Sequence, residues 1–107
     1  MNNEIKKLTP AVSYVCTKTQ KWQKYEAFII EELALDDGIE IVFEYRDYEN
    51  IDASSCRQGF ERMVSDINNN NVPHRIVVNN RDCLPQDLSA LNTDVEIIEI
   101  KYISEQD

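Results

Sequence analysis

Glycine and proline are scarce in this chain, with only two glycines and three prolines among its 107 residues. An all-β fold with many tight turns uses far more of both, so the composition argues against that class. Long hydrophobic runs are also missing. Nothing approaches the roughly 20 apolar residues of a membrane span, and residues 1–8 have no apolar core of a signal peptide. We therefore expect a cytoplasmic protein that does not bind membranes, with its three cysteines present as thiols.

Basic side chains are scarce after residue 24. Residues 1–24 carry five lysines and one glutamate, whereas residues 25–107 carry six basic and nineteen acidic side chains, a net charge of −13. An acidic surface repels the phosphates of a nucleic acid, so we expect no specific DNA binding. Only the basic N-terminal region is suited to contact a polyanion.

What the chain does contain fits one globular domain. Apolar residues make up 42% of it and charged residues 29%, both near globular averages. A chain of this length can bury one core but not two. We assign residues 1–10 to an N-terminal extension and residues 11–107 to the domain.

Four apolar runs rich in β-branched residues predict buried strands. They comprise residues 11–16, 39–45, 75–79 and 95–103. Between them, apolar residues at steps of three and four predict two helices. The expected inward faces are Trp22, Tyr25, Ile29 and Leu33 in the first helix, and Phe60, Met63, Val64 and Ile67 in the second.

Polar residues predict where these helices begin and end. The capping candidates are Thr17 or Thr19 for the first helix and Ser54 or Ser55 for the second. Gly38 and the asparagine run at residues 68–71 favour the left-handed conformation that ends a helix. Residues 84–91 predict one or two further helical turns, with Pro85 near their start.

This alternation of strands and helices predicts a mainly parallel sheet of four to five strands in a three-layer α/β/α sandwich. Ligands of such sheets bind at the carboxyl ends of the strands. Residues 16–20, 47–57 and 79–86 follow three of the strands, so we expect these segments to meet in one crevice.

Three blocks lie in these segments: YVCTKTQKWQ, EYRDYENIDASSCRQGFERMVSDI and DCLPQD. Together they resemble the catalytic domain of the serine recombinases, the resolvase and invertase family. The corresponding family blocks are Tyr-x-Arg-Val-Ser-Thr, then Asp-Arg-Pro-Gly-Phe with Gln-Arg-Met-Leu-x-Asp-Ile, and finally Asp-Arg-Leu-Ser-Arg-Asp. The resemblance covers residues 11–91 and implies a resolvase-like fold with the strand order 2-1-3-4.

In that family a serine attacks a DNA phosphate, and arginines stabilise the charge that develops. The resemblance puts Lys18 at the serine position, or Thr17 or Thr19 if the alignment slips by one residue. Three arginine positions hold Cys16, Cys83 and Gln86, while Arg57, Asp82 and either Gln20 or Gln23 are kept. Loss of one such charge donor typically lowers a rate by about 10²–10³. We therefore expect no recombinase activity and interpret the chain as non-enzymatic.

The three cysteines allow a different kind of site. Cys16, Cys56 and Cys83 all map to the expected crevice, where three thiols would suit zinc binding or redox chemistry. The alternative, which we favour, is small apolar filler, because cysteine is often buried and no Cys-x-x-Cys spacing occurs. No metal or cofactor is expected.

The polar residues of the crevice leave two further alternatives. Lys18, Gln20 and Arg57 would suit a small anion. Without a phosphate to grip, Arg57 and Asp82 would instead hold each other in a partly buried ion pair.

The function that we expect is that of a non-catalytic, resolvase-like domain. It would be a protein-interaction or regulatory module, or the remnant of a mobile-element recombinase. Its partner would be a protein, either an intact recombinase or a second copy of the chain. The alternative is a small-anion or phosphate-binding domain, or an enzyme, that reuses the crevice through Lys18, Arg57 and Asp82.

Overall fold

The structure is a computed structural model and describes residues 7–17, 23–48 and 58–102. The strands are β1 (Thr9–Thr17), β2 (Ile39–Tyr48), β3 (Arg75–Val78) and β4 (Glu96–Glu99). The helices are α1 (Gln23–Asp36), α2 (Gln58–Asn68) and the short 3₁₀ helix η2 (Arg81–Cys83). Among the described residues, no helix has both the length and the apolar character needed to cross a membrane.

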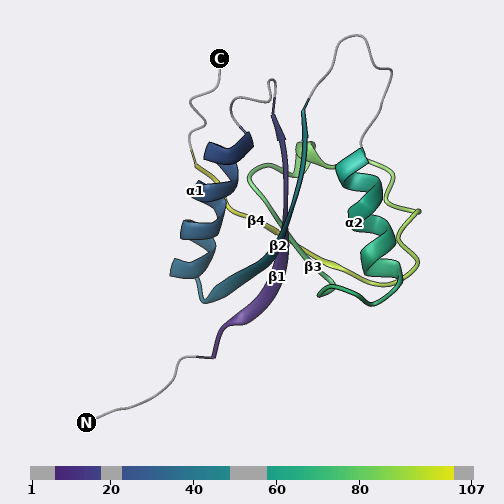
Figure 1. Ribbon diagram of the computed structural model, residues 1–107, viewed down its shortest axis with the longest axis horizontal. Coiled ribbons are helices and arrows are strands. Elements are labelled where there is room, and N and C mark those ends of the chain that lie inside the picture. Colours follow the sequence, from purple (N-terminus) through teal and green to yellow (C-terminus); the bar gives the residue numbers. More distant parts are fainter. Residues whose placement is uncertain (1–6, 18–22, 49–57, 103–107) are drawn as a thin grey trace.

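The four described strands form one sheet in the order β2-β1-β3-β4, and every neighbouring pair is parallel. Figure 1 shows this sheet edge-on, with α1 against one face and α2 against the other. The α/β class and the three layers that the sequence predicts are therefore confirmed. The strand order is the one that the resemblance implies.

Side chains of the central strand β1 alternate between two cores, as the pleat of a strand requires. Val12 and Tyr14 point into the core beneath α2, whereas Ala11 and Val15 point into the core beneath α1. Strand β3 does the same, with Ile76 and Val78 on the α2 side and Val77 on the α1 side. Both faces of the central strands are buried, which explains their continuous apolar runs.

The expected inward face of α2 is confirmed. Its buried residues are Phe60, Met63, Val64 and Ile67. The asparagine run ends this helix as expected: Asn70 takes a left-handed φ of 59°, and the Asn71 N–H donates back to the Asp66 carbonyl at 2.9 Å. Gly38 ends α1 in the same way, with a φ of 80°.

The expected inward face of α1 is wrong. Tyr25 is exposed, and Ile29 and Leu33 are only half-buried, while Trp22 lies outside the described residues. The buried residues of α1 are instead Glu26, Ala27, Ile30 and Ala34. Apolar side chains occur on most sides of this helix, so their spacing does not fix its rotation. Alanines allow a helix to approach a sheet closely, which explains why the alanine face is the one that packs.

Of the four capping candidates, Thr17 lies among the described residues. Thr17 is the last residue of β1. Thr19, Ser54 and Ser55 lie outside the described residues.

The helical turns expected at residues 84–91 do not form. The only helical structure described nearby is η2, which ends before Pro85. Leu84 is extended, with φ −95° and ψ 150°, because a residue that precedes proline disfavours the helical region. The segment is held by α2 instead: the Asn68 side-chain amide donates to the Ala90 carbonyl at 2.9 Å and accepts from the Asn92 N–H at 3.0 Å.

Strand lengths also differ from the expectation. Strands β1 and β2 run longer than predicted, whereas β4 spans only Glu96–Glu99 of the expected residues 95–103. Beyond β4 the chain still follows the sheet, because the Ile100 N–H donates to the Val78 carbonyl at 2.8 Å. This continuation carries Tyr102 to the carboxyl edge of the sheet.

Candidate functional site: the carboxyl edge of the sheet

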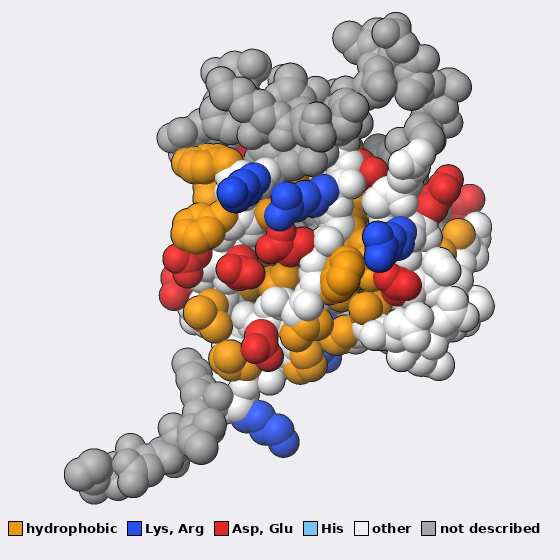
Figure 2. All heavy atoms as spheres, viewed as in Figure 1, with side chains coloured by type: hydrophobic (Ala, Val, Ile, Leu, Met, Phe, Trp, Pro, Cys, Tyr) orange, Lys and Arg blue, Asp and Glu red, His pale blue; other side chains and the backbone are white. Residues whose placement is uncertain are grey.

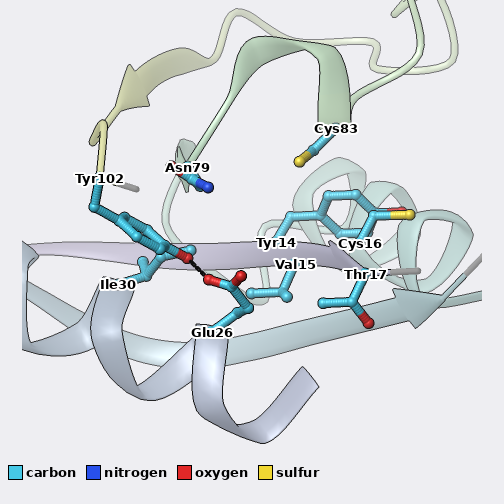
Figure 3. A pocket seen from close by; sticks show the side chains of 9 residues that line it. All are labelled: Tyr14, Val15, Cys16, Thr17, Glu26, Ile30, Asn79, Cys83 and Tyr102. Atoms are coloured by element: carbon cyan, nitrogen blue, oxygen red, sulfur yellow. Dashed lines mark hydrogen bonds between the residues drawn. The ribbon is translucent and has the colours of Figure 1, made fainter. Parts of the chain in front are cut away.

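A small pocket lies where β1 and β3 end, at the edge that the sequence predicts for a ligand crevice (Figure 3). Its lining residues are Tyr14, Val15, Cys16, Thr17, Glu26, Ile30, Asn79, Cys83 and Tyr102. Residues from two of the three expected segments therefore meet here. Helix α1 and the chain after β4 also contribute, which the sequence did not predict. The volume open to a water-sized molecule is about 20 Å³, which is room for one water.

A hydrogen bond between Tyr102 and Glu26 closes one side of the pocket. Figure 3 shows the Tyr102 hydroxyl pointing at the Glu26 carboxylate, to which it donates. Glu26 is only 3% exposed. Burial, together with this hydrogen bond, raises the pKa of the Tyr102 hydroxyl above its ordinary range. This hydrogen bond connects helix α1 to the chain that follows β4.

Cys16 and Cys83 line the same pocket, Cys16 from the end of β1 and Cys83 from the end of η2. Both are half-buried, and both pack against the core beneath α2. Within residues 7–17, 23–48 and 58–102, no group of three histidine, cysteine or acidic side chains is arranged to hold a metal ion. The interpretation of Cys16 and Cys83 as small apolar filler predicts such packing. The third cysteine, Cys56, lies outside the described residues.

Asp47 is a buried residue of this edge that the sequence analysis missed. It is 7% exposed, near the end of β2, and its carboxylate accepts three hydrogen bonds. The Tyr14 hydroxyl donates at 2.7 Å, the Gly59 N–H at 2.7 Å and the Phe60 N–H at 2.9 Å. The two backbone donors belong to the first turn of α2, where a carboxylate is favoured by the helix dipole. Asp47 therefore anchors α2 to the sheet.

Gly59 makes this anchor possible. A Cβ at residue 59 would overlap with the backbone carbonyl of Arg46, so only glycine fits at this close approach of α2 to β2. The sequence held a signal for the anchor: an aspartate near the end of an apolar strand, followed by a Gly-Phe pair that opens a helix.

The other expected site residues do not form a described cluster. Lys18, Gln20, Cys56 and Arg57 lie outside the described residues. Asp82 and Gln86 are exposed, which differs from the partly buried carboxylate expected at Asp82. The Asp82 N–H donates to the Asn80 side-chain oxygen at 2.9 Å, so Asp82 takes part in the start of η2 through its backbone.

Thr17, the hydroxyl that a slipped alignment would favour, is buried in the pocket lining, whereas Thr19 and the Gln23 side chain lie outside the described part.

Comparisons of this chain with protein-family models, with curated proteins and with solved structures find no match.

Proposed function

We propose that this chain is a non-catalytic, resolvase-like domain that acts in the cytoplasm through protein contacts. It is a regulatory or interaction module, or the remnant of a mobile-element recombinase. Its partner is an intact recombinase or a second copy of the chain, and it needs no cofactor. The observation that carries the proposal is the small pocket without described cationic residues at the carboxyl edge of the sheet.

Size is the first argument. A phosphodiester needs far more room than the about 20 Å³ that the pocket offers to a water-sized molecule. Its space is narrowed by Cys16 on β1, by Cys83 on η2, and by the hydrogen-bonded Glu26 and Tyr102, which all line it.

Charge is the second argument. Phosphoryl transfer requires cationic donors around the reacting phosphate. None of the described lining residues is a lysine or an arginine, and the one carboxylate among them, Glu26, repels an anion. This lining also disfavours the alternative of an anion site at the pocket.

The outer surface supports the interaction part of the proposal. Among the described residues, five large hydrophobic side chains are exposed: Tyr25, Phe28, Leu35, Val42 and Phe43. Three belong to α1, and two belong to the edge strand β2, against which α1 packs. Figure 2 shows hydrophobic side chains among the charged ones on this side of the molecule. Exposed apolar side chains on α1 and on the neighbouring β2 edge support a surface for a protein partner.

Two assays test the proposal. The chain is incubated with supercoiled plasmid, with an intact serine recombinase and its target site as the positive control. We expect neither nicking nor a covalent protein–DNA adduct on a denaturing gel. In the second assay, millimolar phosphate is titrated into isotope-labelled protein, and we expect no saturable shift of the amide signals. An adduct would overturn the proposal, and saturable shifts at residues 16–20, 57 and 82 would replace it with the anion-binding alternative.

A further inference from the structure

Strand β2 lies at one edge of the sheet, with β1 on its inner side. In the part of the chain that the structure describes, no strand pairs with its outer side. Such an edge exposes a row of backbone N–H and C=O groups that can pair with another chain. Val42 and Phe43, in the middle of this edge, are 47% and 41% exposed.

A bulge divides β2 into two parts. Ala11 pairs with Ile41 and Val12 pairs with Phe43, so Val42 is the extra residue. After the bulge, residues 43–47 pair with residues 12–16 of β1 without interruption. This regular segment is the part of the edge that is suited to receive another strand.

The charges of the regular segment are self-complementary. Glu44 and Arg46 share the α1 face of β2, since they pair with Ser13 and Val15, and their side chains form an ion pair of 2.7 Å. Suppose that a second β2 runs antiparallel beside the first, with a two-fold axis at Tyr45. Glu44 of each copy then lies directly opposite Arg46 of the other. Opposite residues of an antiparallel pair share a face and interact, so two ion pairs form across the axis.

Charge also disfavours the neighbouring registers. An axis at residue 44 would oppose two copies of Glu44, and an axis at residue 46 would oppose two copies of Arg46. An axis at Phe43 would oppose Glu40 and Arg46, but the bulge puts these two side chains on different faces of the sheet. Of the registers centred within the regular segment, the one at Tyr45 brings opposite charges together twice.

Apolar side chains flank this segment on both faces of the sheet. On one face, α1 packs mainly against β1 and β2 and exposes Tyr25 and Phe28. On the other face, Phe43 stacks on Tyr45 with ring centroids 4.7 Å apart, and the Arg62 guanidinium lies 5.9 Å from the Phe43 ring centre. A two-fold axis perpendicular to the sheet puts both copies of α1 on the same face. The exposed side chains of α1 are then available to a second copy.

We propose that two copies of this chain associate through antiparallel pairing of residues 43–47 of β2 about a two-fold axis at Tyr45. The product is one continuous sheet with α1 of both copies on one face and α2 of both copies on the other. This proposal names the partner for the interaction surface, and so it rests on the proposed function.

A charge-swap experiment tests the pairing. The oligomeric state is measured by size-exclusion chromatography with light scattering. The protein concentration is raised stepwise to about 1 mM, where even weak dimers form. We expect the wild type to dimerise. Glu44→Arg and Arg46→Glu each put like charges opposite one another twice, so each variant alone should dimerise at least about tenfold more weakly.

The mixture of the two variants is the decisive sample. In a mixed pair the two arginines of the first variant face the two glutamates of the second, so an equimolar mixture should dimerise like the wild type. Restored dimers also show that both variants are folded. The matched controls are Glu61→Arg on α2 and Lys101→Glu after β4, which make the same charge changes away from the edge and should dimerise like the wild type.

Three outcomes would overturn the pairing: a wild type that stays monomeric at every concentration, a dimer that neither variant weakens, or a mixture that stays monomeric. If the wild type is monomeric, a strand that pairs with the β2 edge must come from a different protein. None of these outcomes bears on the plasmid and phosphate assays, so a failure of this inference is distinguishable from a failure of the proposed function.

Discussion

The two helices use their large side chains in opposite ways. Helix α2 buries Phe60, Met63, Val64 and Ile67 against the sheet and is anchored at its start by Asp47. Helix α1 packs through Ala27, Ile30 and Ala34, and it turns Tyr25, Phe28 and Leu35 outward. The large apolar residues on the inward face of α2 are all buried in the core, so the fold explains their presence. The three that α1 exposes are not buried, so the fold does not explain theirs.

This difference predicts different effects of substitutions on the two sides. A solvent-exposed Phe28 contributes little to burial within one chain, so its role is to be sought in association. The α2 side is a core, and changes there should lower stability. The exposed side chains of α1 and of the β2 edge form a surface, and changes to them should lower association while leaving stability nearly unchanged. Substitutions on the two sides test this difference.

The largest loss should come from Asp47→Ala. The change leaves three donors, the Tyr14 hydroxyl and the N–H groups of Gly59 and Phe60, without their acceptor in a buried site. We expect a loss of about 3–5 kcal/mol in the free energy of unfolding, because each unsatisfied buried group costs about 1–3 kcal/mol. Urea denaturation measures the loss.

Asp47→Asn is the matched control, because it keeps one acceptor oxygen and the shape of the side chain. Its loss should lie between those of the wild type and Asp47→Ala. A loss below about 1 kcal/mol for Asp47→Ala would mean that this carboxylate is not the anchor of α2.

The next largest difference should separate Met63→Ala from Phe28→Ala. Met63 is fully buried on α2, so its truncation should cost about 2–5 kcal/mol. Phe28 is 57% exposed on α1, so its truncation should change stability by less than about 0.5 kcal/mol. Both are measured by urea denaturation of dilute protein, where association does not contribute. Similar losses for the two variants would remove the distinction between the core and the surface.

A smaller effect should appear at alkaline pH. Burial raises the pKa of Tyr102, as does its hydrogen bond to Glu26, above the ordinary value of about 10. Burial also raises the pKa of Tyr45, which donates to Asp66 at 2.6 Å. The folded state therefore keeps both hydroxyls neutral. The stability that they contribute is present below about pH 10 and is lost as the pH rises through the raised folded values.

The test compares urea denaturation of the wild type and of the double variant Tyr45→Phe, Tyr102→Phe at several pH values. Below about pH 10 the double variant should be less stable, by about 1 kcal/mol for each lost hydrogen bond. Above that pH the wild type should lose stability more steeply than the variant does. Parallel pH profiles would show that the two hydroxyls titrate normally in the folded protein.

The regular spacing of apolar residues was enough to predict part of the fold. Alternation and helical spacing located the four strands, the parallel sheet and the inward face of α2, because large apolar residues at regular steps leave one solution. They could not predict the rotation of α1, whose apolar residues occur on most sides. Nor could they predict that Asn68 of α2 would bind the backbone of Ala90 and Asn92, next to the helix expected at residues 84–91.

The candidate site was predictable only in part. The meeting of Cys16 and Cys83 at one pocket follows from the topology of a parallel sheet, and the sequence predicted it. The bond between Glu26 and Tyr102 depends on where the chain runs after β4, which no local pattern encodes. Asp47 was missed because its three hydrogen bonds, two from the first turn of α2 and one from Tyr14, involve residues distant in sequence.

The smallest effect should come from Asp82→Ala. If Asp82 were paired with Arg57 in a partly buried site, its removal would cost on the order of 3 kcal/mol. Its side chain is exposed, however, and among the described residues its carboxylate takes part in no ion pair. We therefore expect a change in the free energy of unfolding of less than about 0.5 kcal/mol. The matched control is Asn80→Ala, which removes the acceptor of the Asp82 N–H and should cost more, about 0.5–2 kcal/mol. A loss near 3 kcal/mol for Asp82→Ala, with a smaller one for Asn80→Ala, would restore the ion pair with Arg57, because an exposed carboxylate that stabilises the fold so strongly must have a cationic partner.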